Sequence, residues 1–265
     1  MPYTDNQDVK IYYEVEGQGP PLIFVHGATG DLSVWRTCGY VDHFKHDYTV
    51  ILFDVRGHGQ SDKPHDVAAY NYRFLADDVI AVLDALHVVR THFWGYSLGG
   101  GVGFALAKYY PQRIRSLILG GAGPDSAAEP MTEPPSPFLE IMRTGVQEGP
   151  EAVVQGVRDL FGAITPDYEA QLRSLDYQAQ AAMFEYLQYH LHSFEDVLPT
   201  MVMPCLIYVG DGDDPDFTHT QDYVKQMPNA VFVGLPGYNH VEAIAKPGVI
   251  VTQALDFLAK VEEAS

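Results

Sequence analysis

The chain has 265 residues, a length that suits one large domain or one domain that carries an insertion. Its 16 Lys and Arg residues against 35 Asp and Glu residues give a net charge of -19, which argues against nucleic acid or an anionic membrane as a partner. The N-terminal sequence has no basic start followed by an apolar stretch, and no run approaches the roughly 18 apolar residues that cross a bilayer, so we expect a cytoplasmic protein.

Short apolar runs alternate with helical patterns along the chain, and this alternation is typical of an α/β fold with a mostly parallel sheet. Residues 3–4 and 9–16 flank the turn-like residues 5–8 and predict an antiparallel hairpin at the sheet edge. The later runs are continuously apolar, as expected of strands that are covered on both faces. With the hairpin they predict eight strands, the last six at residues 21–25, 48–53, 91–94, 114–119, 205–209 and 230–233.

Helical spacing is clearest over residues 75–86, where one face carries Leu75, Val79, Val82, Leu83 and Leu86. A second helix is predicted at residues 98–110, where a proline follows, and a closing helix at residues 249–261.

The alternation breaks between Pro124 and Thr200, where helical patterns run without a strand candidate. We therefore predict a core domain formed by residues 1–123 and 201–265, with a helical insertion, residues 124–200, placed inside it. A Pro-rich passage at the start of the insertion is expected to form an extended connector, with Pro130, Pro134, Pro135 and Pro137. The predicted helices of the insertion cover residues 138–147, 151–161, 166–175 and 177–191.

Gly95-Tyr96-Ser97-Leu98-Gly99 is the one G-x-S-x-G segment of the chain. It follows a predicted strand and opens a predicted helix, which is the setting in which a serine hydroxyl stands strained and exposed at the carboxyl edge of a sheet. Ser97 is therefore the predicted nucleophile. The alternative is a buried structural serine in a glycine-rich turn.

A serine nucleophile needs a base within hydrogen-bond reach and an acid that fixes the tautomer of that base. His240 follows the strand predicted at residues 230–233 and is the predicted base, whereas His219 lies in a segment that looks like the start of a helix. The acid candidates follow the strand predicted at residues 205–209, or the strand before it, and are Asp211, Asp213, Asp214, Asp216 and Asp125.

The remaining histidines are expected to have no catalytic role. Five of them fall in predicted helices or connectors and are expected to be solvated: His43, His46, His65, His87 and His92. His190 and His192 end a predicted helix of the insertion and are minor candidates for the pocket.

No metal or other cofactor is expected. The aspartate-rich loop at residues 211–216 could bind calcium, but it lacks the glycine placement and the terminal Glu of a twelve-residue calcium loop. Cys38 and Cys205 lie far apart without metal-type spacing, so neither a zinc site nor a disulfide framework is indicated. Cys205 opens an apolar run and is predicted to be a buried thiol.

Attack of a serine on a carbonyl builds negative charge on the oxygen, which backbone N–H groups must stabilise. One predicted donor is the N–H of Leu98, at the start of a helix whose dipole adds positive potential. The second is expected in the loop at residues 26–30, with Ala28 as the prediction and Thr29 as the alternative. His26 is expected to hold this loop by hydrogen bonding.

With these features the chain resembles the α/β-hydrolase superfamily over residues 9–261. Residues 54–61, with the sequence Asp-Val-Arg-Gly-His-Gly-Gln-Ser, are similar to the D-x-R-G-x-G-x-S loop of that family. The resemblance implies a structural role for Asp54, Arg56 and His58.

The resemblance also selects the acid, because the family's G-x-x-D motif maps onto Gly210 and Asp213. Residues 236–240 are similar to the P-G-x-G-H approach to the histidine, with Asn239 in place of the last glycine; Asn tolerates left-handed backbone. The insertion matches in position the helical cap that family members place over the site.

Serine at the elbow argues against the dehalogenase and epoxide-hydrolase branches of the family, which place Asp there. Esterases, lactonases, perhydrolases and carbon-carbon bond hydrolases remain, and the loop at residues 26–31 lacks the Gly-Pro-Gly of the carbon-carbon hydrolases. We therefore expect a hydrolase that cleaves a small, largely apolar carboxylic ester or lactone through an acyl-enzyme. The alternatives are a carbon-carbon bond hydrolase and a ligand-binding member that turns over slowly.

A working hydrolase of this kind needs an apolar pocket between cap and core. Trp35 and Tyr96 are the predicted walls on the core side, Tyr96 because it adjoins the nucleophile. Bulky apolar residues of the insertion are the predicted walls on the cap side: Phe138, Met142, Phe161 and Phe184.

Overall fold

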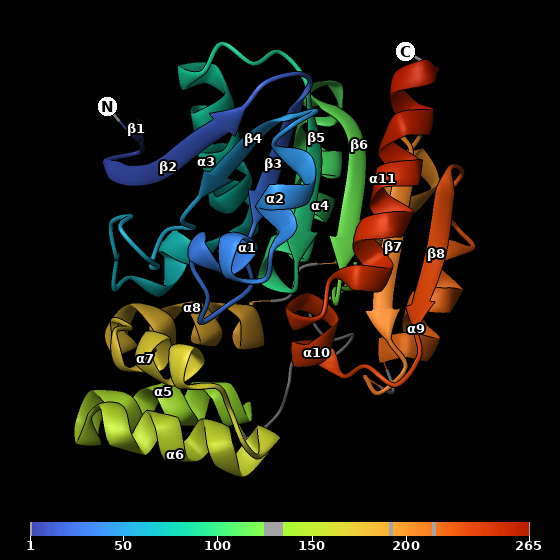
Figure 1. Cartoon of the computed structure of the whole chain (residues 1–265). Helices are drawn as coiled ribbons and strands as arrows, with labels where there is room; N and C mark the ends of the chain where they lie inside the picture. The colour runs from blue at the N-terminus through green and yellow to red at the C-terminus, as the bar shows by residue number, and fades with distance from the viewer. Residues whose placement is uncertain (1, 125–134, 191–192, 214–215, 265) are drawn as a thin grey trace.

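An eight-stranded sheet runs through the middle of the protein (Figure 1). The structure is a computed structural model that describes residues 2–124, 135–190, 193–213 and 216–264. The strand order is β1-β2-β4-β3-β5-β6-β7-β8; β2 pairs antiparallel with β1 and β4, and the other pairs are parallel. The strands are β1 (Tyr3–Asn6), β2 (Val9–Gly17), β3 (Pro21–Val25), β4 (Thr49–Phe53), β5 (Thr91–Tyr96), β6 (Ile114–Gly120), β7 (Cys205–Gly210) and β8 (Ala230–Leu235). The predicted fold class, a mostly parallel eight-stranded sheet with an edge hairpin, is confirmed.

Helices cover both faces of the sheet, which explains why its central strands are continuously apolar. Every residue of β5 and β7 is buried, including Cys205, as predicted. One face packs against α3 and α4, and the other against α1, α2 and α11. These helices and the two short ones near the C-terminal strands are α1 (Ser33–Thr37), α2 (Tyr40–Phe44), α3 (Tyr72–Ala85), α4 (Leu98–Tyr109), α9 (Asp216–Val224), α10 (His240–Ala245) and α11 (Gly248–Glu263).

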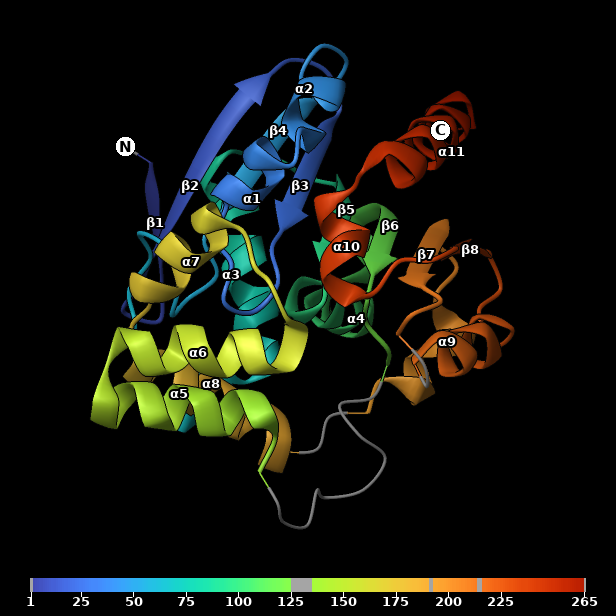
Figure 2. The ribbon, with the colours of Figure 1, turned by 60° about the horizontal axis from the view of Figure 1, so that its bottom comes forward.

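Four further helices, together called the helical layer below, lie beyond one end of the sheet (Figures 1 and 2). They are α5 (Pro137–Glu148), α6 (Pro150–Phe161), α7 (Pro166–Arg173) and α8 (Tyr177–Tyr189), and they match the four predicted helices closely. The side chains of Ser136, Thr165 and Asp176 accept hydrogen bonds from backbone N–H groups at the starts of α5, α7 and α8. Most of the predicted Pro-rich connector, with Pro130 and Pro134, lies outside the described residues. Within the described ranges, none of the helices of the protein has the length and apolar character that crossing a membrane requires.

The expectation that His92 is solvated is wrong. His92 lies in β5 with 0% of its surface exposed, and its ring nitrogens are 2.8 Å from the Ser116 hydroxyl and 2.8 Å from the Glu262 carboxylate. A polar side chain is tolerated in this buried strand because both ring nitrogens have partners. Burial lowers the pKa of His92, although the bond to Glu262 acts in the opposite direction. The other histidines that were expected to be solvated, His43, His46, His65 and His87, are exposed.

Candidate active site

The G-x-S-x-G segment forms a sharp turn between β5 and α4. Ser97 at its centre has φ 53° and ψ -114°, a backbone conformation that residues other than glycine rarely adopt. A Cβ on Gly95 would lie 2.1 Å from the carbonyl oxygen of Gly99, and a Cβ on Gly99 would lie 2.2 Å from the carbonyl oxygen of Val25. The two flanking positions therefore have no room for a side chain, and the turn matches the strained strand-to-helix elbow that displays a nucleophile.

His240 is the first residue of α10, a helix that was not predicted from the sequence. The side chain of Asn239 accepts a hydrogen bond from the N–H of Glu242 at 2.9 Å, and the Glu242 carboxylate accepts one from the N–H of Asn239 at 3.2 Å. This reciprocal pair is a capping box, and its N-x-x-E pattern at residues 239–242 was the signal available in the sequence.

The backbone at Asn239 is not left-handed. Its φ is -90° and its ψ is -179°, an extended conformation that any residue can adopt. Asn therefore replaces the family's glycine because its side chain caps α10, and its tolerance of unusual backbone is not used.

Asp213 contacts the predicted base. Its Oδ2 lies 3.2 Å from Nδ1 of His240, and the two side chains are 13% and 36% exposed. Asp211 has a different role, since its carboxylate accepts a hydrogen bond from the N–H of Gly237 at 2.7 Å. Asp211 thus supports the turn that leads to His240, while Asp213 faces the imidazole ring.

Tyr96 and the backbone at residues 120–121 connect Ser97 with His240. The Tyr96 hydroxyl donates to the carbonyl oxygen of His240 at 2.5 Å, and the two rings are 5.2 Å apart. The N–H of Ser97 donates to the carbonyl oxygen of Gly120 at 2.8 Å, and a Cβ on Gly121 would lie 2.9 Å from Cε1 of His240. The Ser97 hydroxyl has no hydrogen-bond partner in the part of the chain that the structure describes.

The loop at residues 26–30 lies directly against Ser97. A Cβ on Gly27 would lie 3.2 Å from Cβ and 3.7 Å from Oγ of Ser97, and the N–H of Gly30 donates to the carbonyl oxygen of Gly27 at 3.2 Å. Among the described residues, no acceptor binds the backbone N–H of Ala28 or of Leu98. Both groups are therefore free to meet a substrate oxygen.

His26 fastens this loop to the sheet. Its Nε2 accepts a hydrogen bond from the N–H of Val55 at 3.1 Å, and its Nδ1 lies 2.8 Å from the carbonyl oxygen of Gly27. Burial lowers the pKa of His26, which keeps the imidazole neutral and able to accept this bond. These contacts agree with the expected bracing role.

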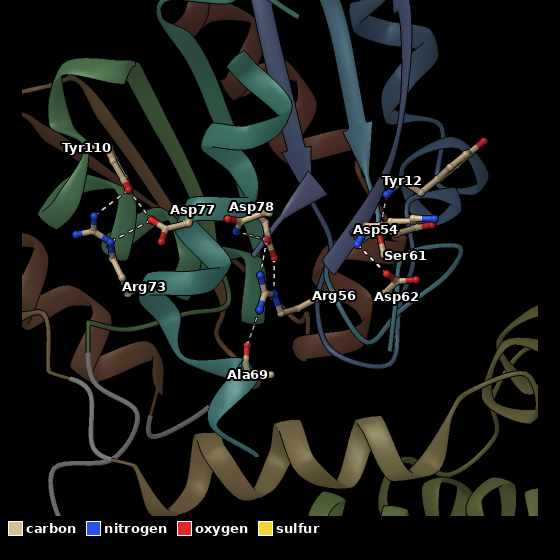
Figure 3. Close-up of polar contacts among 12 residues, drawn as sticks. Tyr12, Asp54, Arg56, Ser61, Asp62, Ala69, Arg73, Asp77, Asp78 and Tyr110 are labelled. Carbon is tan, nitrogen blue, oxygen red and sulfur yellow. Dashed lines mark hydrogen bonds and ion pairs between the residues drawn. The ribbon is translucent and has the colours of Figure 1, made fainter. Parts of the chain in front are cut away.

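The loop at residues 54–61 is held by a dense set of buried polar contacts (Figure 3). The Asp54 carboxylate accepts hydrogen bonds from the N–H groups of Leu32 and Gln60 at 2.8 and 2.7 Å. The Arg56 guanidinium binds both oxygens of Asp78 at 2.7 and 2.6 Å, with both side chains 1–2% exposed. The charged side chains of this loop therefore support the fold.

His58 is buried in the same loop. Its Nδ1 donates to the carbonyl oxygen of Arg56 at 3.0 Å, its ring lies 5.0 Å from that of His26, and burial lowers its pKa to about 3. The bond to the carbonyl oxygen of Arg56 therefore supports the backbone of the loop with a neutral imidazole.

The predicted pocket residues fall into two groups. Phe138, Phe161 and Phe184 gather in the helical layer: Phe138 stacks on Phe184 with ring centres 5.3 Å apart and lies 5.7 Å from Phe161. Trp35, Met142 and Tyr96 do not fit the predicted pocket walls, because they are 0%, 0% and 2% exposed. Trp35 packs against Phe24 and its neighbours in the core beside the sheet, and Met142 packs in the small core of the helical layer.

A cavity of about 270 Å³ lies between the loop at residues 57–63 and helix α7. None of the predicted pocket side chains lines it; the lining is mostly polar and consists of Gly30, Asp31, Gly57, His58, Gly59, Gln60, Lys63, Gln171, Ser174, Leu175 and Asp176.

Several alternative site residues fall where the structure gives no description. Asp214, Asp125 and His192 lie outside the described residues, as does the side chain of Asp216. His190 is exposed and stacks on Tyr186 at 4.5 Å. Within the described ranges, no three His, Cys, Asp or Glu side chains come together as metal ligands would.

Comparison with known proteins gives matches in sequence and in structure. Residues 20–153, half of the chain, match the family described as alpha/beta hydrolase fold. The sequence is 39% identical to 3-oxoadipate enol-lactonase 2 of Acinetobacter baylyi over 115 residues, which are 43% of the chain. It is 36% identical to the 2-hydroxymuconate semialdehyde hydrolase of Pseudomonas sp. strain CF600 over 118 residues, which are 44% of the chain. The matched segments span only 42% and 41% of the lengths of those two proteins.

The structural match extends over nearly the whole chain. The crystal structure of the enol-lactonase from Burkholderia xenovorans LB400 superposes with a TM-score of 0.79 at 24% identity, covering 97% of this chain and 100% of that one, which shows a common fold. The family match at residues 20–153 includes the elbow serine and the loop at residues 26–30. On this ground the chain belongs to the α/β-hydrolase fold family.

Proposed function

We propose that the protein is a hydrolase that cleaves a carboxylic ester or a lactone through Ser97, His240 and Asp213. The observation that carries the proposal is the strained turn at Ser97, φ 53°, which lies against the loop at residues 26–30 and beside an Asp–His pair joined at 3.2 Å. The fold alone would not select this chemistry, because one fold hosts many reactions.

The Asp–His pair supports the role of general base. With Nδ1–H donated to Asp213, the Nε2 lone pair of His240 is left to accept the proton of the Ser97 hydroxyl, and Asp213 stabilises the imidazolium that forms. A hydrogen bond between the Ser97 hydroxyl and His240 is expected to form when substrate binds. The serine then adds to the substrate carbonyl, the alcohol part leaves with the proton from His240, and water releases the acyl group by the reverse sequence.

The free N–H groups of Ala28 and Leu98 are proposed as the oxyanion hole. They belong to two loops that meet at Ser97, and each N–H has no acceptor among the described residues. Donors fixed by the backbone need no reorganisation as charge develops, and one such donor contributes on the order of 10²–10³ in rate.

We further propose that residues 124–200 form a cap domain over the site, and that Phe138, Phe161 and Phe184 supply apolar surface to the substrate. The stacking of these rings in the helical layer supports a preference for an apolar ester or lactone. The two enol-lactonases to which the chain is similar add weight to a lactone, since their names give a bond of this class.

A carbon-carbon bond hydrolase is the second candidate, and the 36% identity with the 2-hydroxymuconate semialdehyde hydrolase favours it. A turnover screen separates the two. We expect hydrolysis of p-nitrophenyl esters or of lactones, and little turnover of vinylogous diketones. The reverse preference would support the carbon-carbon hydrolase, and no turnover of any substrate would support a binding role.

The same screen tests the nucleophile. Ser97→Ala is expected to lower kcat by a factor of about 10⁴ or more at an unchanged unfolding temperature, and a phosphonate or sulfonyl fluoride is expected to label Ser97. Label on another serine, or a variant that keeps more than about a hundredth of the activity, would overturn the proposed role of Ser97.

A further inference from the structure

Tyr168 of the helical layer touches the loop at residues 26–30 directly. Helix α7 begins with Thr165, whose hydroxyl accepts a hydrogen bond from the N–H of Tyr168 at 3.3 Å, and with Pro166 in its first turn. This start fixes the position of Tyr168 on α7. Its hydroxyl lies 3.0 Å from Oγ1 of Thr29, although the two residues are 139 positions apart in the sequence.

Thr29 needs a partner of this kind. Its φ is 60°, in the left-handed region, which is unfavourable for a β-branched residue. It is 4% exposed, and a buried hydroxyl left without a hydrogen-bond partner is destabilising. The bond to Tyr168 satisfies that hydroxyl and stabilises the unusual backbone at the same time.

The backbone of Thr29 directly follows Ala28, whose free N–H is the proposed oxyanion donor. The turn around it is short, since Gly30 bonds back to Gly27 at 3.2 Å, and Gly27 lies against Ser97. A change in the Thr29 backbone would move the peptide units on either side of it and would break the bond from Gly30 to Gly27. Loss of that bond would release the Gly27–Ala28 peptide, which carries the N–H of Ala28.

We infer that Tyr168 is a positioning residue that acts through Thr29 to hold the Ala28 N–H where the substrate oxyanion forms. The helical layer then sets the geometry of the oxyanion hole in addition to covering the site. This inference rests on the proposed function, and the two can fail separately, as the following experiment shows.

The first arm of the experiment compares two tyrosines of the helical layer. Tyr168→Phe removes the hydroxyl and keeps the ring. We expect kcat on a p-nitrophenyl ester to fall about tenfold, with KM changed by less than about twofold. The loss in kcat is smaller than the factor of about 10²–10³ that a whole oxyanion donor contributes, because the displaced N–H keeps part of its effect. The matched control is Tyr177→Phe, whose hydroxyl donates to the carbonyl oxygen of Leu172 at 2.9 Å inside the helical layer. It should stay within about twofold of the unmodified protein in kcat.

The second arm measures the oxyanion hole itself. A boronic acid that binds reversibly to the serine hydroxyl as a tetrahedral adduct should bind Tyr168→Phe about tenfold more weakly and Tyr177→Phe equally well. Thr29→Ala should show the same loss, and the double variant Thr29→Ala with Tyr168→Phe should lose no more than either single change, since both break one contact.

The outcomes separate the two ideas. Equal kcat and boronic acid affinity in Tyr168→Phe and Tyr177→Phe, or losses that add fully in the double variant, would overturn the positioning role while the proposed function stands. Retained activity in Ser97→Ala would overturn the proposed function whatever Tyr168→Phe does.

Discussion

Two sets of polar and charged residues follow strands of the sheet, and they differ in how firmly they are held. In the loop at residues 54–61, Asp54, Arg56 and His58 are 1–2% exposed and are bound by backbone groups or by an ion pair. Asp213 and His240, in contrast, are 13% and 36% exposed and are joined by a 3.2 Å contact. The more elaborate polar arrangement supports the fold, and the simpler one is left accessible to a substrate.

This difference gives a rule for choosing site residues in the chain. A charged group whose bonding capacity is filled inside the protein has little left for a substrate, and moving it would expose an unpaired charge. Burial with partners inside the protein thus marks residues that support the fold, and partial exposure beside the strained turn at Ser97 marks the residues proposed for catalysis.

The largest expected effect on activity concerns Asp213. Asp213→Asn should lower kcat by about 10³ to 10⁴, because an amide at this position stabilises the wrong tautomer of His240. Asp211→Asn is the matched control and should lower kcat by less than about tenfold, since Asp211 supports a turn. Initial rates on a p-nitrophenyl ester measure both, and a larger loss in Asp211→Asn would move the acid to Asp211.

Substitutions in the loop at residues 54–61 should lower the stability of the protein. Arg56→Met leaves Asp78 buried without its charged partner, with only the hydrogen bond from Asn6 described as remaining, and is expected to lower the free energy of unfolding by about 3–5 kcal/mol. Arg143→Met removes an exposed ion pair with Glu185 and should have a far smaller effect. Urea unfolding compares them; equal losses in the two variants would mean that the buried pair does not brace the loop.

His58 should make the protein sensitive to acid. The unfolded chain takes up a proton at this imidazole near pH 6.5, but the folded protein does so only near pH 3. Protonation therefore favours the unfolded chain between these two values. The contribution of His58 to the free energy of unfolding is highest above pH 6.5 and decreases as the pH falls toward 3. Between pH 6.5 and 5 the loss amounts to about 2 kcal/mol.

His58→Asn removes the titrating group and keeps a donor near the Nδ1 position. The unfolding free energy of this variant should therefore fall less steeply between pH 6.5 and 5 than that of the unmodified protein, while His87→Asn, at an exposed site, should keep the original slope. Parallel slopes for His58→Asn and the unmodified protein would show that His58 titrates normally.

The smallest expected effect concerns the helical layer. Phe184→Ala removes one of two stacked rings and should change the ratio of kcat/KM between long-chain and acetyl esters about tenfold, the worth of one or two methylenes in an apolar pocket. Leu160→Ala, at an exposed position on α6, should leave the ratio unchanged. If Phe184→Ala lowers all esters equally, the stacked rings stabilise the helices and do not select substrate.

Local patterns in the sequence were enough to predict the sheet and the elbow turn, and they placed His240 and several candidate aspartates after strands of the sheet. Each depends on residues close together in the chain or on the order of strands in a parallel sheet, as with the loops that follow β7 and β8. The choice of Asp213 among those aspartates followed from the resemblance to a family, as did the bracing of the loop at residues 54–61.

The failures share a physical cause, which is that the partner is distant in sequence. His92 is buried because Glu262, 170 residues later, reaches its ring. Trp35 is enclosed by aromatic residues from β3, β5 and α2, and no local pattern distinguishes that environment from a pocket wall. The contact between Thr29 and Tyr168 was likewise out of reach of local patterns.

The chain leaves the sheet after β6 and returns to it at β7, and these two strands are direct neighbours. The two ends of the excursion are also fastened to each other, since the N–H of Phe194 donates to the carbonyl oxygen of Pro124 at 2.7 Å. The described part of the segment between them also packs on the core through α8 and through the contact of Tyr168 with Thr29. A transplanted segment joined at Pro124 and Phe194 would leave the pairing of β6 with β7 in place, and it offers a way to change which molecules reach the proposed nucleophile Ser97.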